Sequence, residues 1–355
     1  VNLEMIWVEP GTFTMGSPTT EAGRISDETE HNVTLTKGFY LGKHEVTQSQ
    51  YEAIMSGNSN GLNAKPSQFS GNPNRPVEKI TWNDVQVFLE RLNTKVAAHI
   101  PVGWAYILPT ETQWEYACRA GTTTAYFWGN NISASNGNYK QNIGHTVDIG
   151  QYAANPWGFL DMHGNVWEWT ADWDQATPPA GNPVIDPTGP NTGSNRILRG
   201  GAWDALNQSN LRSARRSNLA STFRNYALGF RLAYKQVSVP PSNLQSVSAL
   251  TIAENQPVGT FVGEFNATDP DVNATLTYSL VDGNGSTDNS LFTLDTNGTL
   301  KNAVSFNYES NASTYAIRVQ AKDDYNATVE KAFTVSLTNV NEPATGSISI
   351  NGIQN

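Results

Sequence analysis

The side chains that most often bind transition metals or act as nucleophiles are scarce in this sequence. Cys118 is the single cysteine among 355 residues, which excludes an intrachain disulfide and any zinc site built from several thiolates. The five histidines stand apart, and none forms the His-x₃-His spacing that places two imidazoles on one helix face. Neither residue type therefore indicates a zinc or redox-metal centre.

Carboxylates, which hard cations such as Ca²⁺ prefer as ligands, are plentiful but unevenly placed. Residues 245–355 hold 12 acids against 4 bases, whereas residues 1–244 hold 20 acids against 18 bases. The C-terminal acids recur in short segments, and carboxylates bunched in this way repel one another unless a cation lies between them. This part of the chain is therefore the first place to look for calcium.

The net charge limits the possible partners. A formal charge of −10 at pH 7 argues against nucleic acid and against an anionic membrane surface. No 18 consecutive residues are apolar, so the sequence predicts no membrane span. Residues 1–4 lack the features of a signal peptide, so any export signal would lie outside this sequence.

Composition changes sharply near residue 240. All ten tryptophans precede residue 204, and Pro240-Pro241 indicates a short extended linker. An alternating pattern resumes at the C-terminal end of the sequence, which indicates the first strand of another module. We predict a first domain over residues 1–235, a linker over 236–244, a second domain over 245–343, and the start of a further module over 344–355.

The two domains predict different folds. In the first, helical periodicity predicts helices over 47–55 and 82–96, and a threonine capping pattern predicts a third helix from Thr110 onward, among short strands and long loops. This mixture is typical of an α+β fold. In the second, six alternating segments separated by Asn-Gly and Asp-Gly turns predict an all-β Greek-key sandwich.

Eight short blocks mark the first domain in a fixed order. They are Met5–Gly16, His44-Glu45-Val46-Thr47, Arg75-Pro76-Val77, Leu108-Pro109-Thr110-Glu111, Trp114-Glu115-Tyr116-Ala117, Gly164-Asn165-Val166-Trp167-Glu168-Trp169, Arg199-Gly200-Gly201 and Leu228-Gly229-Phe230-Arg231. In this order they resemble the formylglycine-generating, sulfatase-modifying factor family. The resemblance implies a C-type-lectin-like α+β domain with little regular structure, held together by calcium.

The resemblance also implies which chemistry has been lost. Enzymes of this family oxidise a substrate cysteine to formylglycine and hold copper with two cysteines shortly after a Gly-Gly pair. Here Gly200-Gly201 is followed by Ala202, and no cysteine occurs after Gly201. Because thiolates capture Cu(I) and serine, asparagine and glutamine do not, we expect no copper and no formylglycine synthesis. Cys118 matches a structural cysteine of the enzymes whose partner position is Ser213, and we expect a buried, inert thiol.

Calcium is the cofactor that the resemblance leaves in place. Carried over residue by residue, its ligands are the side chains of Asp161 and Glu168 and the carbonyls of Gly164 and Val166. A second calcium site of the family would use Asn138 and Tyr139, in a loop that is shorter here around residues 144–147.

The acidic segments of the second domain resemble the calcium motifs of a cadherin repeat. The resemblance implies one cluster at the N-terminal pole, formed by Asp269, Asp271 and Asp323. It implies another at the C-terminal pole, formed by Glu254, Glu309 and Glu342. Two aspartates of the cadherin pattern are replaced by Asn307 and Asn339, and the linker before the domain lacks its acidic motif.

These features predict a non-catalytic, calcium-stabilised binding protein, extracellular or on the cell surface, with a cadherin-type spacer. Its partners would be an extracellular protein or a glycan, and neighbouring modules of the same chain. The predicted ligand surface has the aromatic, amide and arginine chemistry of antibody binding loops. Its members are Trp203, Asp204, Asn207, Gln208, Asn210, Arg224 and Asn225.

Two alternatives remain open. The arginines of this region, Arg212, Arg215 and Arg216, would in one of them pair with loop carboxylates and contribute no ligand contact. In the other, the first domain is a divergent metal-dependent oxidase, or another enzyme of the family, with relocated metal ligands.

Overall fold

The computed structural model describes residues 2–140, 142–175, 183–237, 239–271, 274–324 and 327–343. The chain divides into two compact units, with the boundary in the sequence between Gln236 and Val237. The further module predicted at residues 344–355 lies outside the described residues.

Three α-helices form in the first unit, and a threonine caps each of them. The hydroxyls of Thr47, Thr81 and Thr110 accept a hydrogen bond from the N–H of the third helical residue, whose side chain bonds back to the threonine N–H. The helices lie where the sequence predicts them. They are α1 (Gln48–Met55), α2 (Trp82–Val96) and α3 (Glu111–Arg119), with 3₁₀ turns η1 (Ala97–His99) and η2 (Gln208–Leu211).

The strands of the first unit form three small sheets, ordered β1-β4-β11-β5, β10-β6-β8-β9 and β2-β3-β7. In the first sheet β1 and β11 both pair with β4, which joins the beginning and the end of the unit. The strands are β1 (Met5–Val8), β2 (Gly11–Met15), β3 (His31–Leu35), β4 (Phe39–Gly42), β5 (Trp104–Ile107), β6 (Trp167–Trp173), β7 (Val184–Ile185), β8 (Asn195–Arg199), β9 (Arg216–Ala220), β10 (Leu228–Gly229) and β11 (Ala233–Gln236).

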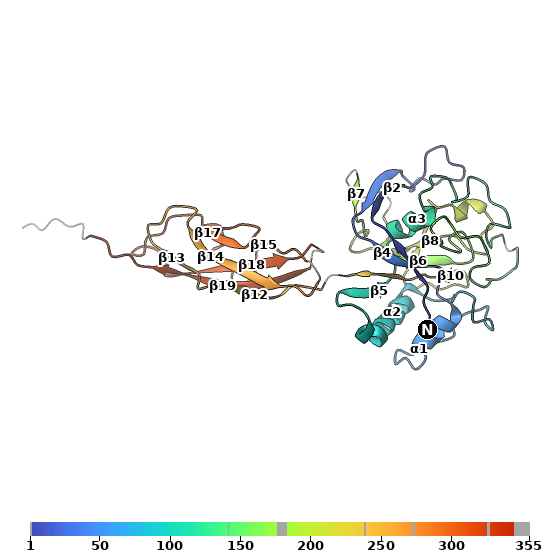
Figure 1. The fold of residues 1–355 in the computed structure, drawn as a ribbon, viewed down its shortest axis with the longest axis horizontal. Coiled ribbons are helices and arrows are strands. Elements are labelled where there is room, and N and C mark those ends of the chain that lie inside the picture. Colours follow the sequence, from blue (N-terminus) through green and yellow to red (C-terminus); the bar gives the residue numbers. More distant parts are fainter. Residues whose placement is uncertain are drawn as a thin grey trace, which may run out of the picture. The chain divides into compact units, whose positions relative to one another are not determined.

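Helices cover both faces of the first sheet (Figure 1). On one face α1 and α2 pack together, with the rings of Tyr51 and Phe88 stacked at 5.4 Å. On the other face Trp114 of α3 and Phe39 of β4 belong to one fully buried cluster. Long loops connect these elements, and most of the predicted site residues of this unit lie on those loops.

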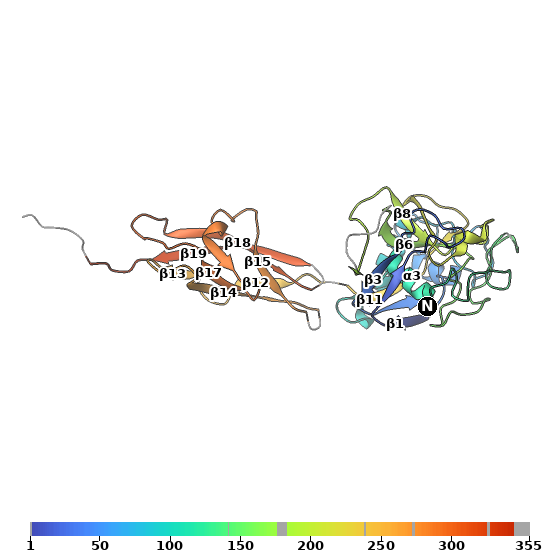
Figure 2. The same ribbon diagram turned by 90° about the horizontal axis from the view of Figure 1, so that it is seen from above.

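The second unit is a β-sandwich, as predicted (Figures 1 and 2). Its sheets have the orders β12-β14-β17-β16 and β13-β19-β18-β15. Alternate residues of β18, such as Ile317 and Val319, point into a core that the facing sheet fills with Phe265 and Leu300. The strands are β12 (Ser242–Ser246), β13 (Thr251–Ala253), β14 (Phe261–Thr268), β15 (Thr277–Leu280), β16 (Phe292–Leu294), β17 (Thr299–Asn302), β18 (Thr314–Lys322) and β19 (Thr328–Thr338), with a 3₁₀ turn η3 (Asn289–Leu291).

Strand β12 shortens the predicted linker. The sequence places a linker over residues 236–244, but Gln236 ends β11 and Ser242 already pairs with Thr268 of β14. The strand buries a single large apolar side chain, Leu244, so its alternation is too short to recognise next to two prolines. The linker between β11 and β12 therefore comprises residues 237–241.

Candidate functional site

The turn at residues 161–168 carries the predicted calcium ligands of the first unit. Asp161 has a φ of 57°, and Gly164 has a φ of 109°. A Cβ atom on Gly164 would lie 2.5 Å from the carbonyl oxygen of Asn138, so this close approach requires glycine. The turn holds Asp161 almost fully buried, and one of its carboxylate oxygens accepts a hydrogen bond from the Gly150 N–H at 2.6 Å.

Glu168 has partners that the sequence analysis missed. Its fully buried carboxylate accepts two hydrogen bonds from Arg231, at 2.6 and 2.7 Å, and one from the indole N–H of Trp114 at 2.7 Å. This bidentate ion pair differs from the predicted role of Glu168 as a calcium ligand, because both oxygens already face donors. Arg231 belongs to one of the eight blocks, but nothing in local spacing links it to a residue 63 positions away.

Three buried side-chain oxygens near this turn have no hydrogen-bond partner among the described residues. They are Oδ1 of Asp161, Oδ1 of Asn138 and Oε2 of Glu45. Asn165 connects two of these side chains, since its amide donates to Glu45 at 3.1 Å and accepts from Asn138 at 3.4 Å. Asp161, Asn138 and Gly164 also line a cavity of about 10 Å³, which is the space of one water-sized sphere.

The pKa shifts of Asp161 and Glu45 show that a positive charge beside these two acids would be favourable. Burial raises the pKa of Asp161 to about 6. Burial, together with the carboxylates of Asp161 and Glu168, raises the pKa of Glu45 well above its usual value. Carboxylate and amide oxygens are calcium ligands, and a cation would offset the cost of burying two acids. The residues present therefore fit a hard cation at Asp161 and Asn138, with Glu45 beside them.

The remaining predicted ligands of this region lie as follows. Val166 is fully buried, directly before β6. The ring of Tyr139 packs in a small apolar cluster with Tyr126 and Leu211, and its carbonyl accepts a hydrogen bond from the Asn142 N–H at 3.1 Å. Asn138, predicted for the second site of the family, thus shares a cavity with Asp161 of the first.

The predicted ligand surface has two regions: one at η2, with Asn207 and Gln208, and an aromatic region around Trp203 and Tyr226. Trp203 is only 7% exposed, because Phe69 and Tyr226 pack against it at 5.2 and 5.5 Å, so it supports the surface from below. The exposed aromatic area comes instead from Phe223 (45%) and Tyr226 (43%). The sequence analysis did not identify the buried Phe69 as part of this region.

The polar residues of the surface are divided between the two regions. Asn207 and Gln208 are exposed at the start of η2, while Asn210 is partly buried. Arg224 is exposed and lies 3.5 Å from Asp84. Asn225 accepts a hydrogen bond from the Ala227 N–H, and burial raises the pKa of Asp204.

Buried ion pairs engage two of the three arginines, as the first alternative predicts. Arg212 donates to Glu28 at 2.7 and 2.8 Å and also contacts Glu21. Arg216 makes a bidentate pair with Glu111 at 2.9 and 2.8 Å. These pairs fasten the loop at 18–28 and the start of α3 to the segment that follows η2.

Cys118 is fully buried, as expected for a structural thiol. Its sulfur lies 3.6 Å from Nε2 of His163. Burial raises the pKa of the thiol to about 12 and lowers the pKa of the imidazole to about 4, so both groups are neutral at pH 7. A neutral thiol is a poor nucleophile, and this pair does not form a thiolate–imidazolium centre.

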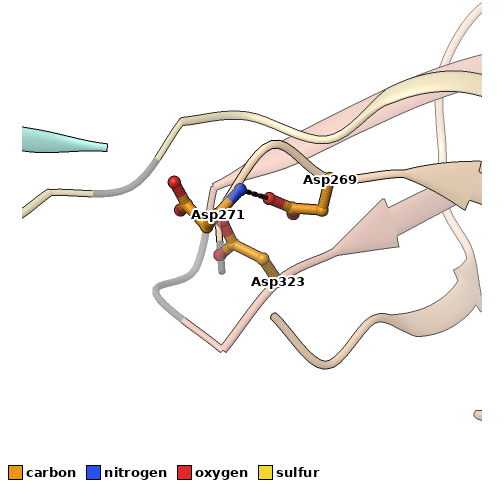
Figure 3. A group of neighbouring side chains, drawn as sticks. All are labelled: Asp269, Asp271 and Asp323. Atoms are coloured by element: carbon orange, nitrogen blue, oxygen red, sulfur yellow. Dashed lines mark hydrogen bonds between the residues drawn. The ribbon is translucent and has the colours of Figure 1, made fainter. Parts of the chain in front are cut away.

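The N-terminal pole of the second unit gathers the three predicted aspartates (Figure 3). Asp269 and Asp271 follow the end of β14, and Asp323 follows the end of β18. Their carboxylate oxygens lie within 4.8 Å of one another. Oδ2 of Asp269 and Oδ1 of Asp271 have no hydrogen-bond partner among the described residues.

The C-terminal pole is arranged differently. Both carboxylate oxygens of Glu254 accept backbone N–H bonds at 2.8 Å, from Val340 and Tyr308, and these bonds lower its pKa. Glu309 accepts from the Asn339 amide at 3.2 Å, and Glu342 accepts from the Asn255 amide. The three glutamates therefore lie at the same pole, where protein donors already contact each of them.

The first unit is an α+β domain whose loops are held by buried ion pairs, and the second is a β-sandwich with a cluster of aspartates at one pole. This combination can be compared with known protein families. A family model described as "Sulfatase-modifying factor enzyme 1-like domain" matches residues 2–236, and one described as "Cadherin domain" matches residues 248–339. The chain therefore belongs to the sulfatase-modifying factor enzyme 1-like family and carries a cadherin domain.

Curated proteins are also similar to this chain. The chain is 34% identical over 185 residues to the formylglycine-generating enzyme of Streptomyces coelicolor. This match covers 47% of this chain and 55% of the enzyme. It is 30% identical over 251 residues to the serine/threonine-protein kinase pkn1 of Chlamydia caviae. This match covers 65% of this chain and 38% of the kinase. The chain thus spans about half or less of the length of these relatives.

Two solved structures have the fold of the first unit. Treponema denticola variable protein 1 superposes with a TM-score of 0.56 at 26% identity, over 66% of this chain and 95% of that protein. PvdO from Pseudomonas aeruginosa superposes with a TM-score of 0.55 at 27% identity, over 66% and 94%. The family match at the sequence level and this likeness in fold agree on the architecture of residues 2–236.

Proposed function

We propose that the protein is a non-catalytic extracellular binding protein, in which the first unit presents a ligand surface and the cadherin domain serves as a spacer. The observation that carries the proposal is the segment after Gly201, which has no cysteine and in which Asn207 and Gln208 are exposed. The resemblance implies that the enzymes of the family hold copper in this segment. Phe223 and Tyr226 add exposed aromatic area nearby in sequence. Rigid aromatic side chains and adaptable amides are the chemistry of binding surfaces.

The cadherin domain favours an extracellular location for the whole chain. Among the described residues, no helix is both long and apolar enough to cross a bilayer. An extracellular protein or a glycan is therefore the partner class that we propose for the first unit, and adjoining modules of the same chain are the partners of the second.

Copper-dependent oxidation provides the direct test of the non-catalytic assignment. Without two thiolates to hold Cu(I), the protein should produce no aldehyde from a sulfatase-derived cysteine peptide in the presence of copper and oxygen. The measurement is mass spectrometry of the peptide, with a formylglycine-generating enzyme as the positive control. Aldehyde above the no-protein background would instead support the alternative, a divergent oxidase, and elemental analysis of the purified protein would then identify its metal.

We also propose that calcium stabilises the first unit through Asp161 and Asn138, with Glu45 as the nearest additional carboxylate. One oxygen of each of these two buried acids and the buried amide oxygen of Asn138 have no donor among the described residues, which supports this assignment. Glu168 takes no part in it, since Arg231 and Trp114 occupy its oxygens.

Chelation should therefore lower the melting temperature of the first unit, and Asp161→Asn should remove this response. A ligand that binds only the folded state stabilises it by about 2.7 kcal/mol at a concentration of 100 Kd. Tryptophan fluorescence isolates the first unit, because all ten tryptophans precede residue 204. Glu168→Gln is the contrasting variant, which should be less stable but keep the response to chelator. Equal melting with and without chelator in the unaltered protein would remove calcium from this turn.

A further inference from the structure

Three loops enclose a groove on the first unit, and one of them carries Asn207 and Gln208 of the predicted ligand surface. They are residues 18–23 before β3, residues 123–131 after α3, and residues 207–212 around η2. The groove has a volume of about 570 Å³. That volume is in the range of sites that bind small ligands.

Neutral hydrogen-bonding groups line this groove. Hydroxyls come from Thr20, Thr123 and Ser209, and amides come from Asn131 and Gln208. Within the described part of the chain, no other side chain or backbone group forms a hydrogen bond with these five side-chain groups. They are thus available, as donors and acceptors together, to a ligand that carries both.

The loops that present these groups are fixed in place. Arg212 donates to the Gly23 carbonyl at 2.7 Å and pairs with Glu21 and Glu28, which ties the first loop to η2. The Tyr126 hydroxyl donates to the Gln208 carbonyl at 2.9 Å, which ties the second loop to η2. A groove that is held open before binding loses little entropy when a ligand enters.

The lining excludes several ligand classes. Arg212 is the one cation among the lining residues, and its two glutamate partners outweigh its positive charge, so phosphate and nucleotide are poorly matched. A lipid would leave the hydroxyls and amides buried without partners, which costs free energy. A neutral molecule with many hydroxyl groups can satisfy both the donors and the acceptors.

We propose that this groove binds a neutral saccharide. The inference deepens the proposed function, because it names the ligand class of a binding protein and rests on that role for the first unit. Gln208, in the segment where the resemblance implies that the enzymes of the family hold copper, becomes a contact residue for sugar hydroxyls. The aromatic region around Tyr226 is not required for this interaction.

The test is a titration of the full chain with neutral tetrasaccharides of glucose, mannose, galactose and N-acetylglucosamine, and with tetragalacturonate as a charged comparison. At least one neutral tetramer should bind at concentrations up to about 1 mM. Each of Gln208→Ala and Asn131→Ala should weaken it by up to about tenfold, as expected for one lost hydrogen bond. Ala22→Trp should block the groove, and Gln68→Ala, exposed on another loop, should bind normally.

The outcomes separate the groove from the broader proposal. No binding of any neutral tetramer overturns the inference, as does binding that survives all three groove variants. Binding that is lost only in Tyr226→Ala would place the ligand on the aromatic region, so that the binding role stands and the groove assignment fails. Aldehyde formation in the copper assay would overturn the proposed function whatever the saccharides do.

Discussion

Replacing Glu168 by glutamine should destabilise the first unit by about 3–5 kcal/mol, with or without calcium. Arg231 and Glu168 are both fully buried, and the carboxylate accepts both donors of the guanidinium fork. Glutamine keeps the size of the side chain but leaves a buried cation unpaired and turns an amide N–H toward one of its donors. The loss of stability follows from the unpaired buried charge of Arg231, because the net contribution of the intact ion pair to stability is small.

Denaturant unfolding followed by tryptophan fluorescence measures this change in the intact chain. Glu4→Gln is the matched control, because Glu4 pairs with Lys43 on the surface at 2.9 Å and its loss should change stability little. Both variants are compared in calcium and in chelator. A loss in Glu168→Gln that disappears in chelator would return Glu168 to the calcium site and overturn the structural role.

Local features of the sequence were sufficient to place the helices. Helix α2 spans the predicted residues 82–96, because Val85, Phe88 and Leu92 repeat at helical spacing behind a threonine cap. The resemblance to a cadherin repeat likewise implied a pole in the second unit, through an Asp-x-Asp motif that keeps Asp269 and Asp271 next to each other in sequence. What these predictions share is that residues close in sequence carry the signal.

The partners of the buried charges could not be predicted in this way. Glu168 meets Arg231, and Arg212 meets Glu28, 184 positions away. Such pairs are set by how the loops pack, and several arginines and acids in the sequence could have been combined differently. The burial of Trp203 by Phe69 has the same origin, so the sequence analysis could not predict that this member of the proposed ligand surface is buried.

Calcium should stabilise the second unit through Asp269, Asp271 and Asp323, and Asp271→Asn should remove that effect. Three carboxylates within 4.8 Å repel one another when no cation is present. Asparagine keeps an oxygen that can accept the Val239 N–H, which now bonds to Asp271 at 3.0 Å. Without calcium the variant should therefore be as stable as the unaltered protein or more so, whereas in calcium it should be the less stable of the two.

This reversal in the order of stability distinguishes a cation site from a cluster of acids that is merely solvated. Calorimetric melting suits the measurement, since the second unit contains no tryptophan and its transition is silent in tryptophan fluorescence. The unaltered unit should gain about 2.7 kcal/mol at 100 Kd of calcium. Asp282→Asn, an exposed acid on another loop, should keep the full gain. If Asp271→Asn and Asp282→Asn respond to calcium equally, the three aspartates do not hold the ion.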